Sequence, residues 1–534
     1  MPGRLLSPAL AWWQQATIYQ IYPRSFQDSN GDGIGDLPGL IHRVDYLSWL
    51  GIDAVWLSPV YRSPMADFGY DISDFTGIDP SFGTLDDFDR LVAALHAHGI
   101  RLILDVVPNH TSDQHPWFVE SRASRTSAKR DWYLWRDPAP DGGPPNSWLS
   151  RFGGSAWTWD EATGQYYYHA FLEEQPDLEW HNPAVRAAFS EVLRFWLARG
   201  VDGFRIDASA VLAEDPLLRD DPPNPSFSDK VPPPERYRRV FTDGRPETLD
   251  YLAEMRRTVD EFPDRVLAGE VQGATERIGR FYGEASAPRF HLPLNFALMD
   301  TPWEVRALSA AIDEYLNAIP EGHSPVWILG GHDKSRIVSR IGLARARVAA
   351  LLLFTLPGTP FFYAGDEIGL ADVEIPPDQV KDPFERLVPG YGLGRDPERA
   401  PMRWDATPNA GFTTGVPWLP VGSGVESCNV AAQRNEAGSM LALYRELIQL
   451  RKRLPALTAG KYLPWRNQGN VLLFERRHAS ARLLVAANIG AKPRRIEIGQ
   501  ARTIFSTMPD AREQGAGIWE VAGDQGMLFE LLPD

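Results

Sequence analysis

The chain has 534 residues, of which 43% are hydrophobic and 23% are charged, and its formal net charge is −16. This composition is typical of a soluble globular protein, and the length suffices for one large core with additional domains. The acidic excess repels nucleic acid and anionic membranes, so neither is an expected partner. The single cysteine, Cys428, excludes an intramolecular disulfide and indicates a reducing compartment. The N-terminal apolar run, broken by Pro8, is too short for a signal peptide or a membrane helix, so we expect a cytoplasmic protein.

Short runs rich in β-branched and aromatic residues alternate with amphipathic segments along most of the chain. Runs of this kind, bounded by turn residues, are typical of buried strands. Eight strands that alternate with helices predict a parallel sheet closed into a (β/α)8 TIM barrel. The expected helices are residues 40–50, 85–98, 183–199, 247–262 and 343–353. The expected strands are residues 18–26, 54–61, 101–109, 203–209, 265–271, 289–298, 326–333 and 359–367.

Three long connections interrupt the alternation, and all of them follow strands. Residues 111–175, after the third strand, are far longer than an ordinary connection and predict a small inserted subdomain. Residues 214–245 and 372–402, after the fourth and eighth strands, are rich in proline or glycine and predict irregular loops. All three leave the C-terminal face of the barrel, where enzymes with this fold build their sites.

The pattern changes near residue 458, where short alternating runs predict a separate antiparallel β-sandwich domain. Its expected strands include residues 471–476, 481–488, 494–498 and 527–532. The expected domains are therefore a catalytic barrel of residues 1–108 and 176–457, an inserted subdomain of residues 109–175, and a C-terminal β domain of residues 458–534.

Charged residues stand at the ends of four expected strands. Arg205 and Asp207, in the segment GFRID, are two residues apart and therefore share one face of a strand. A guanidinium beside a carboxylate lowers the pKa of the acid and keeps it ionised, which suits a nucleophile. A structural ion pair is the alternative for one such pair. The other sets are DVVPNH ending at His110, GEV with Glu270, and GHD with His332 and Asp333, and the four together favour a catalytic site.

These segments resemble the α-amylase superfamily of glycoside hydrolases, in particular its α-glucosidase and oligo-1,6-glucosidase branch. The resemblance covers nearly the whole chain. It begins at residues 16–36 (ATIYQIYPRSFQDSNGDGIGD) and continues through residues 54–75 (AVWLSPVYRSPMADFGYDISDF). DVVPNH, QPDLEW, GFRID, GEV and GHD then follow in the family's order. The resemblance implies the same barrel, an inserted domain after strand three and a C-terminal β domain.

The resemblance also implies roles for three carboxyl groups. Asp207 is the expected nucleophile, Glu270 the acid and base, and Asp333 the group that binds sugar hydroxyls and favours a cationic transition state. Attack by one carboxylate with acid–base work by the other gives net retention and requires a separation of about 5–5.5 Å. The expected substrate-binding residues are Asp67, Tyr70, His110, Phe171, Arg205, Ala208, His332 and Arg399.

Two positions bear on specificity. Gly331 stands where the family usually has Asn before the His-Asp pair, which is expected to loosen the turn after strand seven. Ala208, directly after the nucleophile, is commonly Val in relatives that prefer α-1,6 bonds and Ala or Thr in those that prefer α-1,4 bonds. We therefore expect an exo-acting α-glucosidase that prefers maltose-type oligosaccharides, with transglucosylation possible. The alternatives are a trehalose- or sucrose-isomerising transferase on the same site and a non-catalytic binding protein on this fold. The sequence does not indicate an oligomeric state.

Residues 28–36 (DSNGDGIGD) form a second distinct motif. Oxygen ligands at every second position, with glycines that allow the chain to wrap, suit a hard cation such as Ca²⁺. The loop lacks the Glu at position twelve and the flanking helices of an EF-hand, and a turn satisfied by its own amides is the alternative. In the family this loop binds one structural Ca²⁺, and no organic cofactor is expected. The expected ligands are Asp28, Asn30, Asp32, the Ile34 carbonyl and Asp36.

Overall fold

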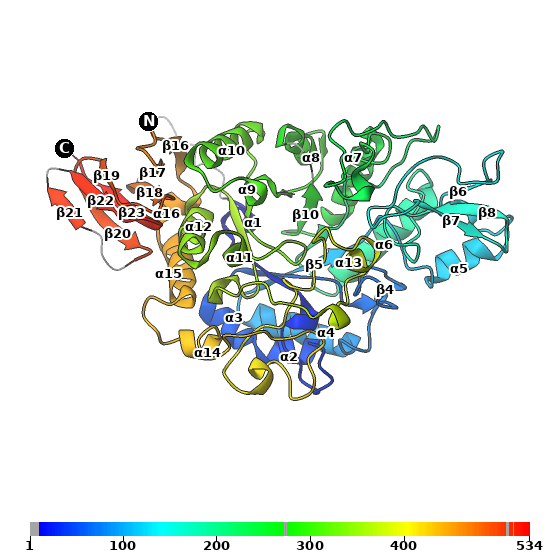
Figure 1. The fold of residues 1–534 in the computed structure, drawn as a ribbon, viewed down its shortest axis with the longest axis horizontal. Helices are drawn as coiled ribbons and strands as arrows, with labels where there is room; N and C mark the ends of the chain where they lie inside the picture. The colour runs from blue at the N-terminus through cyan, green and yellow to red at the C-terminus, as the bar shows by residue number, and fades with distance from the viewer. Residues whose placement is uncertain (1–9, 272, 274, 509–511, 516, 534) are drawn as a thin grey trace.

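A parallel eight-stranded sheet forms the centre of the molecule in the computed structural model (Figure 1), which describes residues 10–271, 273, 275–508, 512–515 and 517–533. The hydrogen-bonded order is β13-β10-β9-β5-β2-β1-β15-β14, and every neighbouring pair is parallel. The two end strands, β13 and β14, also lie against each other, so the sheet curves into a near-closed barrel. The predicted fold class is confirmed. The strands are β1 (Ile18–Ile21), β2 (Ala54–Leu57), β5 (Arg101–Val106), β9 (Gly203–Ile206), β10 (Val266–Val271), β13 (Leu292–Asn295), β14 (Val326–Ile328) and β15 (Thr359–Tyr363).

Amphipathic helices cover the outside of the barrel, and their ends carry the capping residues that helices need. Asn182 accepts a hydrogen bond from the Ala184 amide, with Pro183 at the first helical position of α6. Thr84 and Asp87 form a reciprocal capping box at the start of α4. The covering helices are α3 (Val44–Leu50), α4 (Leu85–Ala97), α6 (Pro183–Ala198), α7 (Pro246–Val259), α8 (Ile278–Tyr282), α10 (Val305–Ala318), α12 (Leu343–Thr355) and α15 (Met440–Arg453).

Several predicted elements are shorter than the sequence pattern suggested. The helix expected at residues 40–50 is two helices, α2 (Leu37–His42) and α3, because Arg43 between them has φ −104° and ψ 4°. The strand expected at residues 18–26 ends at Ile21, and a 3₁₀ turn begins at Pro23, which has no amide hydrogen to donate to a sheet. The strand expected at residues 289–298 is only β13.

The connection after β5 forms a small subdomain with its own sheet. It contains α5 (Pro116–Ala123) and a three-stranded antiparallel sheet of β6 (Trp135–Arg136), β8 (Gln165–Tyr168) and β7 (Trp157–Asp160). Buried aromatic side chains, among them Trp148, Trp157 and Tyr168, form a core separate from that of the barrel. This subdomain lies at the right of Figure 1, at the opposite end of the long axis from the C-terminal domain.

The C-terminal domain is a sandwich of two antiparallel sheets, as predicted. One sheet has the order β16-β17-β18-β23-β20 and the other β19-β22-β21. Apolar side chains from both sheets, including Leu473, Ile496 and Phe529, form one core between them. The limits expected for the three domains stay a prediction. The strands are β16 (Lys461–Pro464), β17 (Val471–His478), β18 (Ala481–Asn488), β19 (Arg494–Glu497), β20 (Ala501–Ser506), β21 (Arg512–Gly515), β22 (Ile518–Val521) and β23 (Gln525–Leu531).

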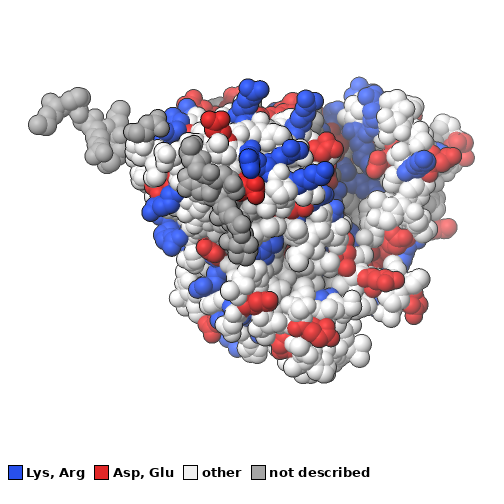
Figure 2. Space-filling model, turned by 60° about the vertical axis from the view of Figure 1, so that its left-hand side comes forward, with Lys and Arg blue, Asp and Glu red and all other residues white. Residues whose placement is uncertain are grey.

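The surface of the molecule carries charged side chains of both signs (Figure 2). Basic and acidic side chains are interspersed over the face shown in Figure 2. Among the described residues, no helix has both the length and the apolar character needed to cross a membrane. The first part of the N-terminal run, residues 1–9 with Pro8, on which the predicted cytoplasmic location partly rests, lies outside the described residues.

Candidate active site

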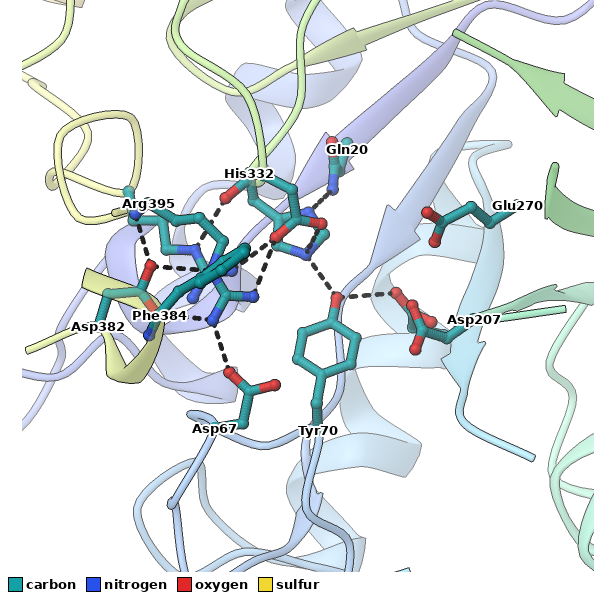
Figure 3. A network of polar contacts seen from close by, with 12 residues as sticks. Gln20, Asp67, Tyr70, Asp207, Glu270, His332, Asp382, Phe384 and Arg395 are labelled. Carbon is teal, nitrogen blue, oxygen red and sulfur yellow. Dashed lines mark hydrogen bonds and ion pairs between the residues drawn. The ribbon is translucent and has the colours of Figure 1, made fainter. Parts of the chain in front are cut away.

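Two of the three predicted catalytic carboxyl groups, Asp207 and Glu270, lie at the carboxyl ends of neighbouring barrel strands (Figure 3). Asp207 directly follows β9, and its amide donates to the Val106 carbonyl of β5 at 2.9 Å. Glu270 is the fifth residue of β10. The register pairs Ile206 of β9 with Gly269 of β10, so Asp207 and Glu270 extend from the same level of the two strands. Parallel strands that end at one edge therefore place both acids at the barrel mouth.

One buried guanidinium joins these acids. The side chain of Arg205 is 2% exposed. Its Nη1 donates to Asp207 Oδ1 at 2.6 Å and to the two carboxylate oxygens of Asp105 at 3.0 and 3.1 Å. Its Nη2 donates to Glu270 Oε2. Since Nη1 and Nη2 belong to one planar group, Asp207 and Glu270 face each other across a single guanidinium. Asp105, for which the sequence analysis predicted no role, is the third carboxylate in the cluster bound by this guanidinium.

The charges in this cluster differ from the sequence-based expectation. Burial raises the pKa of Asp207, Arg205 opposes that rise, and Glu270, Asp105 and Asp333 add to it, so the pKa lies well above its usual range. Burial likewise raises the pKa of Asp105 to about 6 despite Arg205. The three carboxyl groups share one guanidinium, so their titrations are coupled. Arg205 therefore opposes the rise in the pKa of Asp207 but does not outweigh burial and the neighbouring acids.

His332 is held rigidly as a neutral ring. Its ring stacks with those of Tyr22 and Tyr70, with centroids 5.5 Å apart in each pair and interplanar angles of 17° and 5°. Gln20 Nε2 donates to Nδ1 at 2.6 Å, so the ring hydrogen is on Nε2, which lies 2.7 Å from the Tyr70 hydroxyl. Burial lowers the pKa of His332 to about 3. The ring therefore presents a fixed N–H to its surroundings, including Asp333 Oδ2 at 3.1 Å.

Asp333 is the exposed member of the predicted catalytic set. Its side chain is 43% exposed, and Arg399 Nη2 and Arg395 Nη1 donate to Oδ1 at 2.7 and 3.4 Å. Burial alone would raise its pKa, but His332, Arg399 and Arg395 outweigh burial and lower it below the usual range. Asp333 is thus an ionised carboxylate that a ligand can reach, as a group that stabilises positive charge must be.

A second arginine, Arg395, lies beside Arg399, and both donate to Asp333 Oδ1. The side chain of Arg399 is fully buried and its Nε donates to the His332 carbonyl at 2.8 Å, so it holds Asp333 from behind. Arg395 Nη2 instead donates to Asp67 Oδ1 at 2.8 Å. The role of Arg399 at the terminal sugar stays a prediction. Arg395, which the sequence analysis did not single out, is a second arginine beside the same carboxylates.

The remaining predicted binding residues converge on the same region. His110 Nε2 lies 3.1 Å from Gln175 Nε2 and 3.2 Å from the Tyr70 carbonyl, and burial lowers its pKa to about 3. Gln175 Nε2 also donates to Asp67 Oδ2 at 3.4 Å, so Gln175 joins His110 to Asp67. The sequence analysis did not identify this role. The Phe171 ring packs against His110 with centroids 5.2 Å apart. These contacts bring together every predicted polar binding residue around the barrel mouth.

Ala208 has an unusual backbone conformation. Its φ is +46°, in the left-handed region that few residues other than glycine adopt. The next residue, Ser209, donates its hydroxyl to the Glu270 carbonyl, which fixes the turn against the neighbouring strand. Ala208 therefore lies on a strained turn directly after Asp207, and the residue that follows it is bonded to the strand of Glu270. Strain of this kind is common at functional sites.

The predicted cation loop, residues 28–36, is held together by its own amides. Asp28 Oδ1 accepts from the amides of Asn30 and Gly31 at 2.9 and 2.8 Å, and Oδ2 accepts from Gly33 at 2.8 Å. Asp32 accepts from the Ile34 amide at 2.8 Å. These bonds wrap the chain around the Asp28 carboxylate.

The chemistry of this donor set fits a hard cation. All five candidate donors are oxygens, at the first, third, fifth, seventh and ninth positions, and Gly33 at the sixth has a φ of +89°. That spacing with a turn at position six is how cation-binding loops are built. Asp36 also caps α2, accepting from the Gly39 amide at 2.6 Å. In the described part of the chain, however, no three His, Cys, Asp or Glu side chains converge as a metal cluster. The cation therefore stays a prediction.

Comparison with known proteins agrees with this geometry. A family model described as alpha amylase, catalytic domain, matches residues 20–460. The probable α-glucosidase of Rhizobium meliloti (strain 1021) is 43% identical, covering 91% of this chain and 90% of that protein. The oligo-1,6-glucosidase of Parageobacillus thermoglucosidasius is 39% identical, covering 90% and 91%.

Solved structures give the same result. The α-glucosyl transfer enzyme XgtA has a TM-score of 0.93 at 39% identity, covering 98% of this chain and 100% of that one. The trehalulose synthase MutB from Pseudomonas mesoacidophila MX-45 has a TM-score of 0.90 at 36% identity, with the same coverage. The chain therefore belongs to the α-amylase family, glycoside hydrolase family 13, and within it to the α-glucosidase branch.

Proposed function

We propose that the protein is a retaining, exo-acting α-glucosidase that hydrolyses terminal α-glucosyl residues of short oligosaccharides. The observation that carries the proposal is the pairing of Asp207 and Glu270 through one buried guanidinium, with the ionised Asp333 beside them. Two close carboxyl groups suit a double displacement with net retention.

Each acid has a distinct part in the proposed reaction. Asp207 attacks the anomeric carbon while Glu270 gives its proton to the departing glycosidic oxygen, so a glucosyl ester forms and the leaving sugar departs as an alcohol. Glu270 then takes a proton from water, whose oxygen displaces Asp207. Asp333 and the neutral N–H of His332 bind hydroxyls of the same glucosyl unit, and Asp333 stabilises positive charge at the transition state.

The loops around the mouth support an exo-acting enzyme. Phe152 of the inserted subdomain packs on Phe384 of the loop after β15, with centroids 4.9 Å apart. The Tyr391 hydroxyl in the same loop donates to the Asp229 carbonyl, in the loop after β9, at 3.4 Å. Because the three long connections touch one another, we propose a pocket that admits chain ends and not a groove.

Transfer to a second sugar is the alternative on the same residues. A glucosyl ester on Asp207 reacts with either water or a sugar hydroxyl, and the similarity to XgtA and MutB favours keeping transglucosylation and isomerisation as second candidates. The non-catalytic reading is disfavoured, since Asp207, Glu270 and Asp333 are all present. Ala208 supports a preference for α-1,4 bonds.

The decisive test of the proposed function is the variant Asp207→Ala with a nitrophenyl α-glucoside. We expect hydrolysis to fall by orders of magnitude with an unchanged melting temperature. Asp250→Ala, an exposed carboxylate on α7, is the matched control and should retain wild-type activity. Undiminished hydrolysis by Asp207→Ala would refute the mechanism.

We also propose one structural Ca²⁺ in the loop of residues 28–36, held by Asp28, Asn30, Asp32, the Ile34 carbonyl and Asp36. When bound, a cation there would supply stability and no chemistry to the reaction. A cytoplasmic location is proposed as well, on the support of the single cysteine, and cell fractionation would test it.

A further inference from the structure

A fully buried carboxylate outside the predicted site, Asp382, lies beside Arg395 and Phe384 (Figure 3). It precedes the short helix α13 (Pro383–Leu387) in the long loop after β15. Asp382 was not among the predicted residues, and it does not reach the barrel mouth itself. Its contacts nevertheless lead to the groups that do.

Asp382 holds Arg395 at three points. Its Oδ1 accepts from Arg395 Nη2 at 2.7 Å, and its Oδ2 accepts from Arg395 Nε at 2.9 Å and from the Arg395 amide at 2.5 Å. Two parallel bonds between a carboxylate and a guanidinium fix orientation as well as distance. A neighbouring carboxylate, Asp396, accepts from the Lys381 and Asp382 amides at 2.6 and 2.9 Å and so fixes the turn that carries Asp382.

The same carboxylate also fixes an aromatic contact. Asp382 Oδ1 accepts from the Phe384 amide at 3.2 Å and so caps α13. Phe384 packs on Phe152 of the inserted subdomain, and the Arg395 guanidinium lies 5.2 Å from the centroid of that Phe152 ring. The polar and aromatic parts of this wall therefore depend on one residue.

We infer that Asp382 is a positioning residue that holds Arg395 and Phe384 at the closed end of the pocket. The inference rests on the proposed function. Arg395 has three carboxylate partners, Asp382, Asp67 and Asp333, of which only Asp333 is substantially exposed. Without Asp382, the guanidinium is shared between the two others, so we expect it to leave its present position beside Asp67 and the exposed Asp333. A shift of about 1 Å in such a group can cost about 10²-fold in rate.

A purely structural role for Asp382 is the alternative, and Asp382→Asn separates the two. Asparagine has the same size and is also a good helix cap, so the bond to the Phe384 amide survives. It loses the charge and one acceptor, so the two-point pairing with Arg395 does not survive. We expect kcat/KM for maltose to fall about 10²-fold and the inhibition constant of glucose to rise, with little change in melting temperature. Asp378→Asn, an exposed carboxylate in the same loop, is the matched control.

A double-mutant cycle with Arg395→Ala gives the sharpest result. If Asp382 acts through Arg395, Asp382→Asn should change kcat/KM little in the Arg395→Ala background, because the group it positions is gone. Independent, multiplying losses would overturn the inference. So would a wild-type glucose inhibition constant in Asp382→Asn.

A second variant covers the case in which Asp382→Asn does not fold. Arg395→Lys keeps the positive charge but cannot take the two-point pairing, so it should reproduce the loss of kcat/KM and of glucose affinity. Wild-type kinetics in Arg395→Lys would equally overturn the inference. A wild-type protein that hydrolyses no α-glucoside refutes the proposed function instead, and calorimetric glucose binding by the same variants then tests the positioning role alone.

Discussion

Linkage preference should depend on the single side chain at position 208. Ala208 lies between the proposed nucleophile and Ser209, whose hydroxyl bonds to the backbone of the acid and base Glu270. Replacing the methyl group of Ala208 with the isopropyl group of valine would fill space on the leaving-group side. One or two methylenes in a pocket are worth about 1–3 kcal/mol of discrimination, or about 10–200-fold. We expect the wild type to prefer maltose to isomaltose, and Ala208→Val to move that preference toward isomaltose by tens-fold.

The left-handed backbone at Ala208 makes the choice of measurement important. At a φ of +46° a β-branched residue is strained, and the left-handed conformation costs about 1–2 kcal/mol even for ordinary residues. Valine should therefore lower stability and the fraction of active enzyme. Both substrates are assayed with the same strained enzyme, so a lower fraction of active enzyme cancels in the ratio of their kcat/KM values.

The assay is kcat/KM for maltose and for isomaltose in the wild type, Ala208→Val and Ala208→Gly. Glycine relieves the strain and removes only a methyl group, so it should be more stable than the wild type while keeping the α-1,4 preference. A wild type that favours isomaltose, or a ratio that valine does not move, would show that the loops set selectivity and not residue 208.

Two further predictions concern the metal and the shape of the site. Elemental analysis should find about one divalent ion per chain, and chelation should lower the melting temperature, because a ligand bound only by the folded state stabilises it. An unchanged melting temperature after chelation would mean that residues 28–36 are an ordinary turn. Since the three long loops contact one another over the mouth, the enzyme should release glucose from short oligosaccharides and leave iodine staining of soluble starch almost unchanged. Rapid loss of that staining would indicate an open groove.

The barrel could be predicted from local pattern, and so could the place of the proposed catalytic acids at the ends of its strands. Apolar runs alternating with helical periodicity identify parallel strands, and residues that end such strands meet at one edge. This reasoning placed Asp207, Glu270 and Asp333 at strand ends, and the family resemblance supplied the roles proposed for them. Gly331, in contrast, was expected to loosen its turn. Its backbone is not left-handed, and a Cβ there would meet Gln20 Oε1 at 3.4 Å, so the glycine imposes no special conformation.

Features that depend on distant contacts could not be predicted. Arg395 and Arg399 lie in one irregular segment, and only tertiary structure buries one and places the other against Asp67. The raised pKa of Asp207 comes from burial and from the summed field of groups on several strands, which a single Arg-x-Asp motif does not reveal. Asp382 is likewise an ordinary helix cap in sequence, and its bonds to Arg395 appear only in the fold.

The most direct test of the double displacement is the anomeric form of the first glucose released. With maltose or a nitrophenyl α-glucoside as substrate, proton nuclear magnetic resonance in the first minutes should show α-glucose, which then mutarotates to the equilibrium mixture. Two successive displacements, first by Asp207 and then by water, restore the original configuration. Initial release of β-glucose would mean a single displacement by water and would contradict the roles assigned to Asp207 and Glu270.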